Sequence, residues 1–183
     1  ANLYFTPGAR TVLEQHGVLI FKDSSANKCG VISSSFEILA GLSLDDAQFV
    51  SIKKEYALEV VERLKVVANK EAKCMVQAFQ DHVSPSMVAI SEEVSRRINM
   101  YTDAISEYLK PKDLFLPENE RLLNVFINYV PKRLLNEFRQ QILDRVPQMH
   151  MKAIISTSLA TRLVYDKGLG WQVSVVDILP DLI

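Results

Sequence analysis

The sequence is poor in the residues that bind metals and form disulfides. Its 183 residues include only two cysteines, Cys29 and Cys74, and three histidines. The cysteines form no Cys-x-x-Cys pair and the histidines are widely scattered, which excludes the usual spacings of zinc and haem sites. Two cysteines in a chain of this size are typical of free thiols in a reducing compartment rather than of a disulfide.

Long apolar runs and an excess of one charge are also missing. No apolar stretch approaches the roughly 18 residues that a membrane-spanning helix needs. The net charge is −1, from 21 basic and 22 acidic residues, so electrostatics give no case for nucleic acid or an anionic membrane. The sequence therefore predicts neither a nucleic-acid partner nor a membrane partner. With 48% hydrophobic residues, it can still build a substantial core.

Helical patterns dominate residues 36–168. Apolar residues recur there every three or four positions, as expected when amphipathic helices bury their apolar faces against one another. Ser43, followed by Asp45 and Asp46, predicts the cap of a long helix that continues to about Gln80, with a break near Asn69 as the alternative. Pro131 predicts a bend or a boundary between two helices. The predicted fold class is therefore mainly α, with a helical domain over residues 36–183.

The first 35 residues have a different character. Thr6, followed by a proline, predicts the start of a short helix that ends at Gly17. Val18-Leu-Ile-Phe21 is a continuous apolar run of the kind that forms a buried strand in a parallel sheet. A helix, a strand and a polar loop in this order predict a short αβ remnant of a doubly wound domain at residues 1–35. The alternation in residues 171–175 predicts an edge strand.

The polar segment Ser25-Ala-Asn-Lys-Cys-Gly-Val-Ile-Ser-Ser-Ser35 could be a catalytic loop, a phosphate cradle or a connection. Cys29 precedes a predicted helix, whose N-terminus can lower the pKa of a thiol, so it is a candidate nucleophile. A nucleophile needs a base, and His16 and His82 are distant in sequence. A binding loop is a better hypothesis than a catalytic loop, because Gly30 permits close backbone approach and the loop follows the carboxyl end of the predicted strand. Helix capping by the serines explains the segment about equally well.

Two motifs in this part of the chain resemble those of glutamate dehydrogenases. Ala1-Asn2-Leu3 matches the end of their Glu-Gly-Ala-Asn segment. Asn27-Lys-Cys-Gly-Val-Ile-Ser-Ser34 matches the Asn-x-Gly-Gly-Val-x-x-Ser segment that opens a helix in those enzymes. The stretch FKDSSANKCGVISSSFEILAGL is most similar to the large NAD-specific enzymes of bacteria and lower eukaryotes, whose catalytic domain is followed by a helical region. The resemblance in motifs covers residues 1–42.

The resemblance implies roles for individual residues. Asn2 would face the nicotinamide ribose of NAD, and Asn27 would hydrogen-bond near the nicotinamide end, so both are cofactor-binding candidates. Gly30, Val31 and Ser34 would line the pocket for L-glutamate or 2-oxoglutarate, with the Ser34 hydroxyl on the side-chain carboxylate of the substrate. The chain itself is assigned no catalytic residue and no metal ligand.

Cys29 departs from the family pattern, because it stands where the first glycine of the usual pair is expected. A positive φ at this position would cost roughly 1 kcal/mol or more with cysteine. The chain also has no Gly-x-Gly-x-x-Gly turn and no lysine–aspartate pair in family context, parts that lie upstream in those enzymes. We therefore expect a C-terminal fragment of an NAD-dependent glutamate dehydrogenase, inactive alone and belonging to a homo-oligomer of the cytoplasm or mitochondrial matrix. The alternative is a self-standing α-helical protein-interaction module without catalytic activity.

Overall fold

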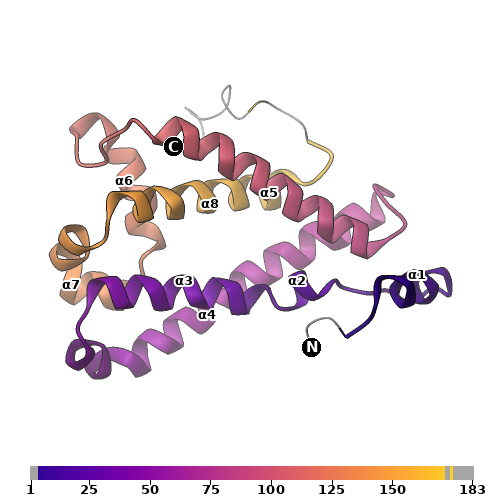
Figure 1. Cartoon of the computed structure of the whole chain (residues 1–183), viewed down its shortest axis with the longest axis horizontal. Coiled ribbons are helices and arrows are strands. Elements are labelled where there is room, and N and C mark those ends of the chain that lie inside the picture. Colours follow the sequence, from indigo (N-terminus) through magenta and orange to yellow (C-terminus); the bar gives the residue numbers. More distant parts are fainter. Residues whose placement is uncertain (1–3, 172–173, 175–183) are drawn as a thin grey trace.

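The computed structural model describes residues 4–171 and residue 174, and these residues form eight α-helices and one short 3-10 helix (Figure 1). In chain order the elements are α1 Pro7–Gln15, α2 Asp23–Ala26, α3 Lys28–Ser43, α4 Asp46–Gln80, α5 Met87–Leu109, η1 Pro117–Asn119, α6 Glu120–Tyr129, α7 Lys132–Arg145 and α8 Gln148–Lys167. The part of the chain that the structure describes contains no strand, so the prediction of a mainly α fold is confirmed. Within the same residues, no helix combines the length and the apolarity needed to cross a membrane.

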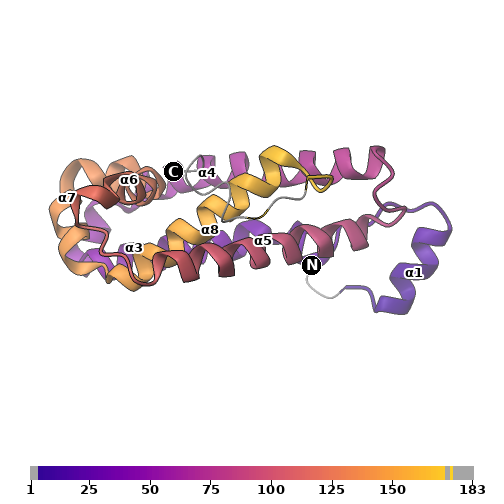
Figure 2. The ribbon, with the colours of Figure 1, turned by 90° about the horizontal axis from the view of Figure 1, so that it is seen from above.

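The helices form an elongated bundle (Figures 1 and 2). The helices α6 and α7 lie at one end of the bundle and α1 lies at the other, while α5 and α8 pack together along its length. One continuous apolar core joins α3 to α8. Its largest fully buried side chains are Phe126, Leu39, Ile52, Met75, Met87, Ile90, Ile105, Leu109, Leu114, Leu134, Ile142 and Met151.

The predicted long helix is confirmed as α4, which runs for 35 residues, so the alternative with a break near Asn69 is wrong. The predicted cap at Ser43 is also wrong, because Ser43 is the last residue of α3 and the N-cap of α4 is Asp45. A reciprocal capping pair begins α4: the Asp45 carboxylate accepts the Gln48 amide at 2.8 Å, and Gln48 Oε1 accepts the Asp45 amide at 3.1 Å. The boundary predicted at Pro131 is also confirmed, since α6 ends at Tyr129 and α7 begins at Lys132.

Two residues of α4, one helical turn apart, hold the junction between α6 and α7. The Glu59 carboxylate accepts the backbone amides of Lys132 and Arg133, at 2.7 and 3.0 Å, at the start of α7. The Arg63 guanidinium donates to the carbonyl of Tyr129, at 2.7 Å, at the end of α6. Burial acts to raise the pKa of Glu59, but the two amides and Arg63 outweigh it and leave that pKa below its usual value. The junction is therefore satisfied by opposite charges at its two helix ends.

The predicted strand at Val18–Phe21 is wrong, because this segment is an irregular connection between α1 and α2. The Val18 amide donates to the carbonyl of Leu13 at 3.0 Å, which closes α1 instead of joining a sheet. A parallel strand depends on its neighbours for backbone hydrogen bonds, and the described residues offer no neighbouring strand. The predicted αβ remnant at residues 1–35 therefore shows helices and an irregular connection, without a strand, in its described residues. The edge strand predicted at residues 171–175 falls mostly outside the described residues.

Polar contacts attach the N-terminal helices to the start of α5. The Glu14 carboxylate accepts the Ser86 hydroxyl at 2.8 Å and the Val88 amide at 3.3 Å. Lys22 forms an ion pair with Glu92 at 2.6 Å. The boundary predicted between residues 35 and 36 falls inside α3, which is continuous, and the division into two domains stays a prediction.

Candidate functional site

The predicted binding segment is helical, so the expectation of a loop is wrong. The helix α3 begins at Lys28, and Asn27 is at once the C-cap of α2 and the N-cap of α3. The helix begins early because Ile32 packs on the core and extends the apolar face formed by Phe36 and Leu39. The polar residues of the segment are therefore displayed on a regular helix surface.

The four described candidates share one exposed face of α3. Asn27, Gly30, Val31 and Ser34 follow the spacing i, i+3, i+4 and i+7, which places them on one side of a helix. All four are exposed, and Val31 is 69% exposed. The structure thus brings together the residues for which the resemblance implies cofactor binding and substrate binding. Asn2, the other cofactor candidate, lies outside the described residues.

The strain expected at Cys29 does not arise. Among the described residues, His82 is the only non-glycine residue with a positive φ, so Cys29 has ordinary helical backbone. The half-buried Cys29 thiol faces α4, where its sulfur lies 3.9 Å from the carbonyl of Leu64. The His16 ring instead contacts the carbonyl of Val12 at 2.7 Å. No described contact links either histidine to Cys29, and the nucleophile hypothesis gains no support.

The three consecutive serines do not cap α3. The hydroxyls of Ser33 and Ser34 both donate to the carbonyl of Gly30, at 2.9 and 3.2 Å. The Ser35 hydroxyl lies 2.8 Å from the hydroxyl of Tyr129, at the end of α6. The capping alternative is therefore wrong, because the serines bond back into the helix or across to a neighbour. To bind a carboxylate, the exposed Ser34 hydroxyl must turn away from Gly30.

Phenol hydroxyls hold the middle of α3 against the bundle. The Tyr56 hydroxyl of α4 donates to the carbonyl of Phe36 at 2.6 Å, one residue beyond the Ser35–Tyr129 contact. Burial raises the pKa of both phenols, and the neighbouring Tyr129 raises that of Tyr56 further. Both groups therefore remain protonated at neutral pH and can act as hydrogen-bond donors.

A buried carboxylate lies beneath the first turn of α3. Glu71 of α4 is 3% exposed, and its Oε2 accepts the hydroxyl of Tyr165, from α8, at 2.6 Å. The ammonium of Lys28, at the start of α3, lies 3.6 Å from the same oxygen. This cluster is not among the residues predicted from the sequence. One signal for it is an acid in the apolar face of α4, because Glu71 continues the spacing of Val60 and Leu64.

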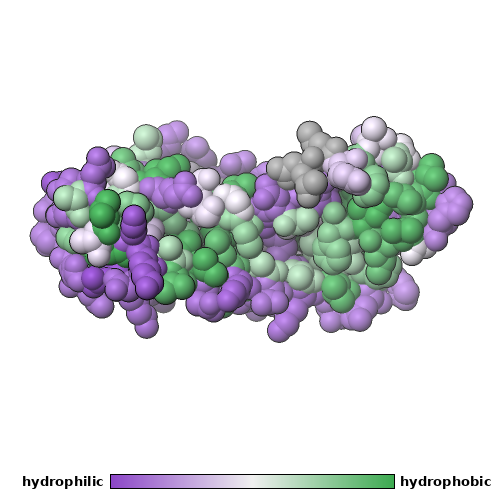
Figure 3. All heavy atoms as spheres, turned by 90° about the horizontal axis from the view of Figure 1, so that it is seen from below, coloured by the Kyte–Doolittle hydropathy of each residue, from purple (hydrophilic) through white to green (hydrophobic). Residues whose placement is uncertain are grey.

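Apolar side chains are exposed on the side of the molecule that carries α3 and α1. On α3 these are Val31, Ile38 and Leu42, and the connection before α2 adds Leu19 and Phe21. Figure 3 views this side and shows apolar surface along its middle and at the end occupied by α1. Exposed apolar surfaces of this kind occur at protein–protein contacts and in ligand-binding grooves.

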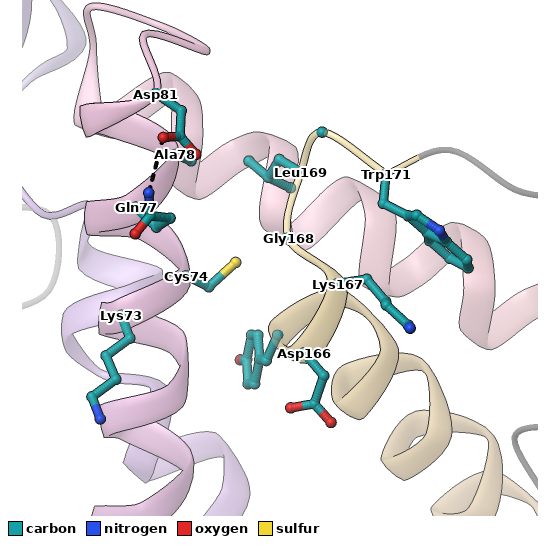
Figure 4. Close-up of a pocket in the computed structure, with 12 residues that line it drawn as sticks. Lys73, Cys74, Gln77, Ala78, Asp81, Asp166, Lys167, Gly168, Leu169 and Trp171 are labelled. Atoms are coloured by element: carbon teal, nitrogen blue, oxygen red, sulfur yellow. Dashed lines mark hydrogen bonds between the residues drawn. The ribbon is translucent and has the colours of Figure 1, made fainter.

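A pocket of about 570 Å³ lies between the C-terminal parts of α4 and α8 (Figure 4). Its two carboxylates already have partners: Asp166 pairs with Lys70 at 3.2 Å, and Asp81 accepts the Gln77 amide at 2.9 Å. Burial, followed by the nearby Glu71 charge, raises the pKa of the Cys74 thiol in its wall. The described residues contain no group of three or more potential metal ligands. None of the candidate binding residues on α3 lines this pocket.

Comparisons with known proteins identify a dehydrogenase family. The family model for Glutamate/Leucine/Phenylalanine/Valine dehydrogenase matches residues 1–102. Glutamate dehydrogenase 2 of Dictyostelium discoideum is 35% identical over 182 residues, which cover 93% of this chain and 17% of that protein. The NAD-specific glutamate dehydrogenase of Saccharomyces cerevisiae is 35% identical, with 92% and 16% covered. That of Neurospora crassa is 31% identical, with 92% and 17% covered. No solved structure matches.

The chain thus spans about one sixth of the length of the curated relatives it matches. The family match covers more than half of the chain and includes all of α3. On this evidence the chain belongs to the Glutamate/Leucine/Phenylalanine/Valine dehydrogenase family.

Proposed function

We propose that this chain works as part of an NAD-dependent glutamate dehydrogenase. The complete enzyme would convert L-glutamate, NAD⁺ and water into 2-oxoglutarate, ammonium, NADH and a proton. The hydride leaves the α-carbon for NAD⁺, the water oxygen becomes the keto oxygen, and the amino nitrogen leaves as ammonium. One observation carries the proposal: Asn27, Gly30, Val31 and Ser34 share an exposed face in a chain similar to proteins named glutamate dehydrogenases.

The chemistry of this face suits the roles proposed for it. The Asn27 side chain makes no hydrogen bond within the described part of the chain, so its amide group is free to hydrogen-bond a cofactor. Its proposed partner is the nicotinamide end of NAD. When bound, NAD supplies the group that accepts the hydride. Val31 offers an apolar wall to the substrate methylenes, and Gly30 leaves room for close approach. The Ser34 hydroxyl donates to the side-chain carboxylate after it turns from Gly30. Asn2 is proposed to face the nicotinamide ribose.

The rest of the chain is proposed to support this wall rather than to react. The exposed apolar residues of α3 and of the connection before α2 would pack against other parts of the enzyme or its subunits in a homo-oligomer. Because the chain spans about one sixth of its relatives, we expect the chain alone to show neither glutamate oxidation nor measurable NAD binding. The proposed compartment is the cytoplasm or the mitochondrial matrix.

Two neighbouring serines provide the test of this proposal. In the complete polypeptide that carries this chain, Ser34→Ala removes the proposed donor to the substrate carboxylate, and we expect the KM for L-glutamate to rise about tenfold or more. Ser33→Ala is the matched control, because both hydroxyls donate to the carbonyl of Gly30 while only Ser34 lies on the proposed face. Ser33→Ala should stay within about twofold of the wild type.

Equal kinetics for the two serine variants would contradict the proposed site. A complete polypeptide without glutamate-dependent NAD⁺ reduction would contradict the proposed activity. That second result would favour the alternative, an α-helical protein-interaction module.

A further inference from the structure

We infer that Lys28, Glu71 and Tyr165 form a positioning cluster that holds the substrate-facing end of α3 in place. The inference rests on the proposed function of the α3 face and extends it to residues of α4 and α8. No member of the cluster lies on that face. Each would act through its effect on the orientation of Asn27 and Gly30.

The cluster joins three helices at one carboxylate oxygen. Glu71 Oε2 accepts the Tyr165 hydroxyl at 2.6 Å and lies 3.6 Å from the Lys28 ammonium. The side chain of Glu71 is 4% exposed and that of Lys28 is 24% exposed. The start of α3 is thereby tied to α4 and, through the same oxygen, to the C-terminal turn of α8.

Burial of the Glu71 carboxylate makes the loss of either contact costly in free energy. A buried carboxylate without donors is costly, so Glu71 favours arrangements in which both Tyr165 and Lys28 stay close. Lys28 is the first residue of α3 and directly follows Asn27, so its inward side chain restricts the rotation of the helix about its axis. That rotation decides which way Asn27, Gly30 and Val31 point.

Other anchors of α3 lie further along the helix. Tyr56 and Tyr129 contact Phe36 and Ser35, two turns after the helix start. In the first turn, the described polar contacts to other helices are those of Lys28 and the long contact of the Cys29 sulfur. The cluster is therefore best placed to orient the residues nearest the cofactor.

Hydrogen exchange on the chain itself tests the positioning without any assumption about activity. Tyr165→Phe keeps the ring and removes the hydroxyl that Glu71 accepts. We expect the amides of residues 31–35 to exchange at least about fivefold faster in this variant. Glu93→Gln is the control, because Glu93 pairs with Arg96 and Arg97 within α5. Unchanged exchange in residues 31–35 of Tyr165→Phe, or an equal effect of the control, would overturn the inference.

Steady-state kinetics of the complete polypeptide test the consequence for the substrate. We expect Tyr165→Phe and Lys28→Met each to raise the KM for L-glutamate about three- to tenfold with kcat within about twofold, since weakened binding is common to ground and transition states. Lys28→Arg restores the cation and should bring KM back to within about twofold of the wild type.

Comparison with the serine variants distinguishes failure of the positioning cluster from failure of the proposed function. If Ser34→Ala raises KM while Tyr165→Phe and Lys28→Met do not, the positioning inference is overturned and the proposed function stands. If Ser34→Ala has no effect either, the proposed function itself fails. Faster exchange in residues 31–35 would still support the positioning of α3 in that case.

Discussion

The side chain of Asn27 occupies the space that a Cβ at Gly30 would need. A methyl group added at Gly30 would come 2.8 Å from Asn27 Oδ1 and 3.4 Å from its Cγ. Gly30 does not have a positive φ, so an added Cβ would conflict with the Asn27 side chain and not with the backbone conformation. The contact couples a candidate cofactor residue to a candidate substrate residue within one turn of helix.

Gly30→Ala should therefore affect binding and stability in different ways. Alanine favours a helix over glycine by roughly 0.5–1 kcal/mol, so the free energy of unfolding should not fall in the isolated chain. In the complete enzyme the displaced Asn27 should raise the KM for NAD about threefold or more. Gly41→Ala is the control, since an added Cβ there meets nothing within 4 Å. The same KM for NAD in both variants would contradict the role of the Asn27–Gly30 contact.

Glu59 should make stability depend on acid pH. Its pKa is lowered below 4.5, so its contribution is complete at neutral pH and is lost as the pH falls through the lowered value. Glu59→Gln should reduce the free energy of unfolding by about 1–2 kcal/mol at pH near 7, and the difference from wild type should narrow towards about pH 3.

Glu55→Gln is the matched control for Glu59, because Glu55 contacts Arg133 only from an exposed position. Its effect should stay within about 0.5 kcal/mol. Denaturant titrations at several pH values measure both variants. A pH-independent difference between wild type and Glu59→Gln would show that the charge of Glu59 is not what holds α7.

Buried phenols should make the fold sensitive to alkali. Burial raises the pKa of Tyr56, Tyr129 and Tyr165, and the hydrogen bond to Glu71 raises that of Tyr165 further. Above the usual tyrosine pKa of 10.0, the unfolded chain loses protons that the folded chain keeps, so the free energy of unfolding should fall as pH rises. Tyr56→Phe should make this decrease shallower. Equal slopes for the variant and the wild type, measured by denaturation between about pH 8 and 11, would refute the assignment.

The two cysteines should react with iodoacetamide at very different rates. Cys74 is 6% exposed, and burial and then the charge of Glu71 raise the pKa of its thiol, while Cys29 is only half-buried. Native protein should be labelled first at Cys29, and at Cys74 at least about tenfold more slowly. Mass spectrometry of the labelled peptides measures both rates, and labelling in denaturant provides the control with equal access. Comparable rates in the native protein would contradict the burial of Cys74.

Local signals in the sequence predicted most helix boundaries. The Thr6 cap and Pro131 act through neighbouring backbone groups, so a single chain segment carries the information. The cap predicted at Ser43 lies two residues before the actual N-cap of α4, Asp45. The strand at Val18–Phe21 failed because an apolar run forms a strand only beside another strand. The early start of α3 was missed although Ile32 already extends the helical spacing of its apolar face.

The candidate site also has a part that the sequence indicated and a part that it did not. The resemblance in motif singled out Asn27, Gly30, Val31 and Ser34, but their shared face was not predicted, because it exists only when the segment is helical instead of a loop. The position of Glu71 in the apolar face of α4 could have marked one member of the Glu71 cluster, but not its partners. The members are separated by up to 137 positions along the chain and meet only through packing of α3, α4 and α8. Sequence spacing carries no information about contacts of that kind.

The uninterrupted α4 also fixes the relative rotation, about the helix axis, of two residues that make distant contacts. Glu59, which holds the start of α7, and Glu71, which meets Lys28, are separated by 12 residues or about 18 Å of helix without glycine or proline. An insertion of one residue between them would turn Glu71 by about 100° away from Lys28 while Glu59 stayed in place. The length of α4 between these two acids is therefore a constraint that related proteins can relax only in steps that preserve the helical phase.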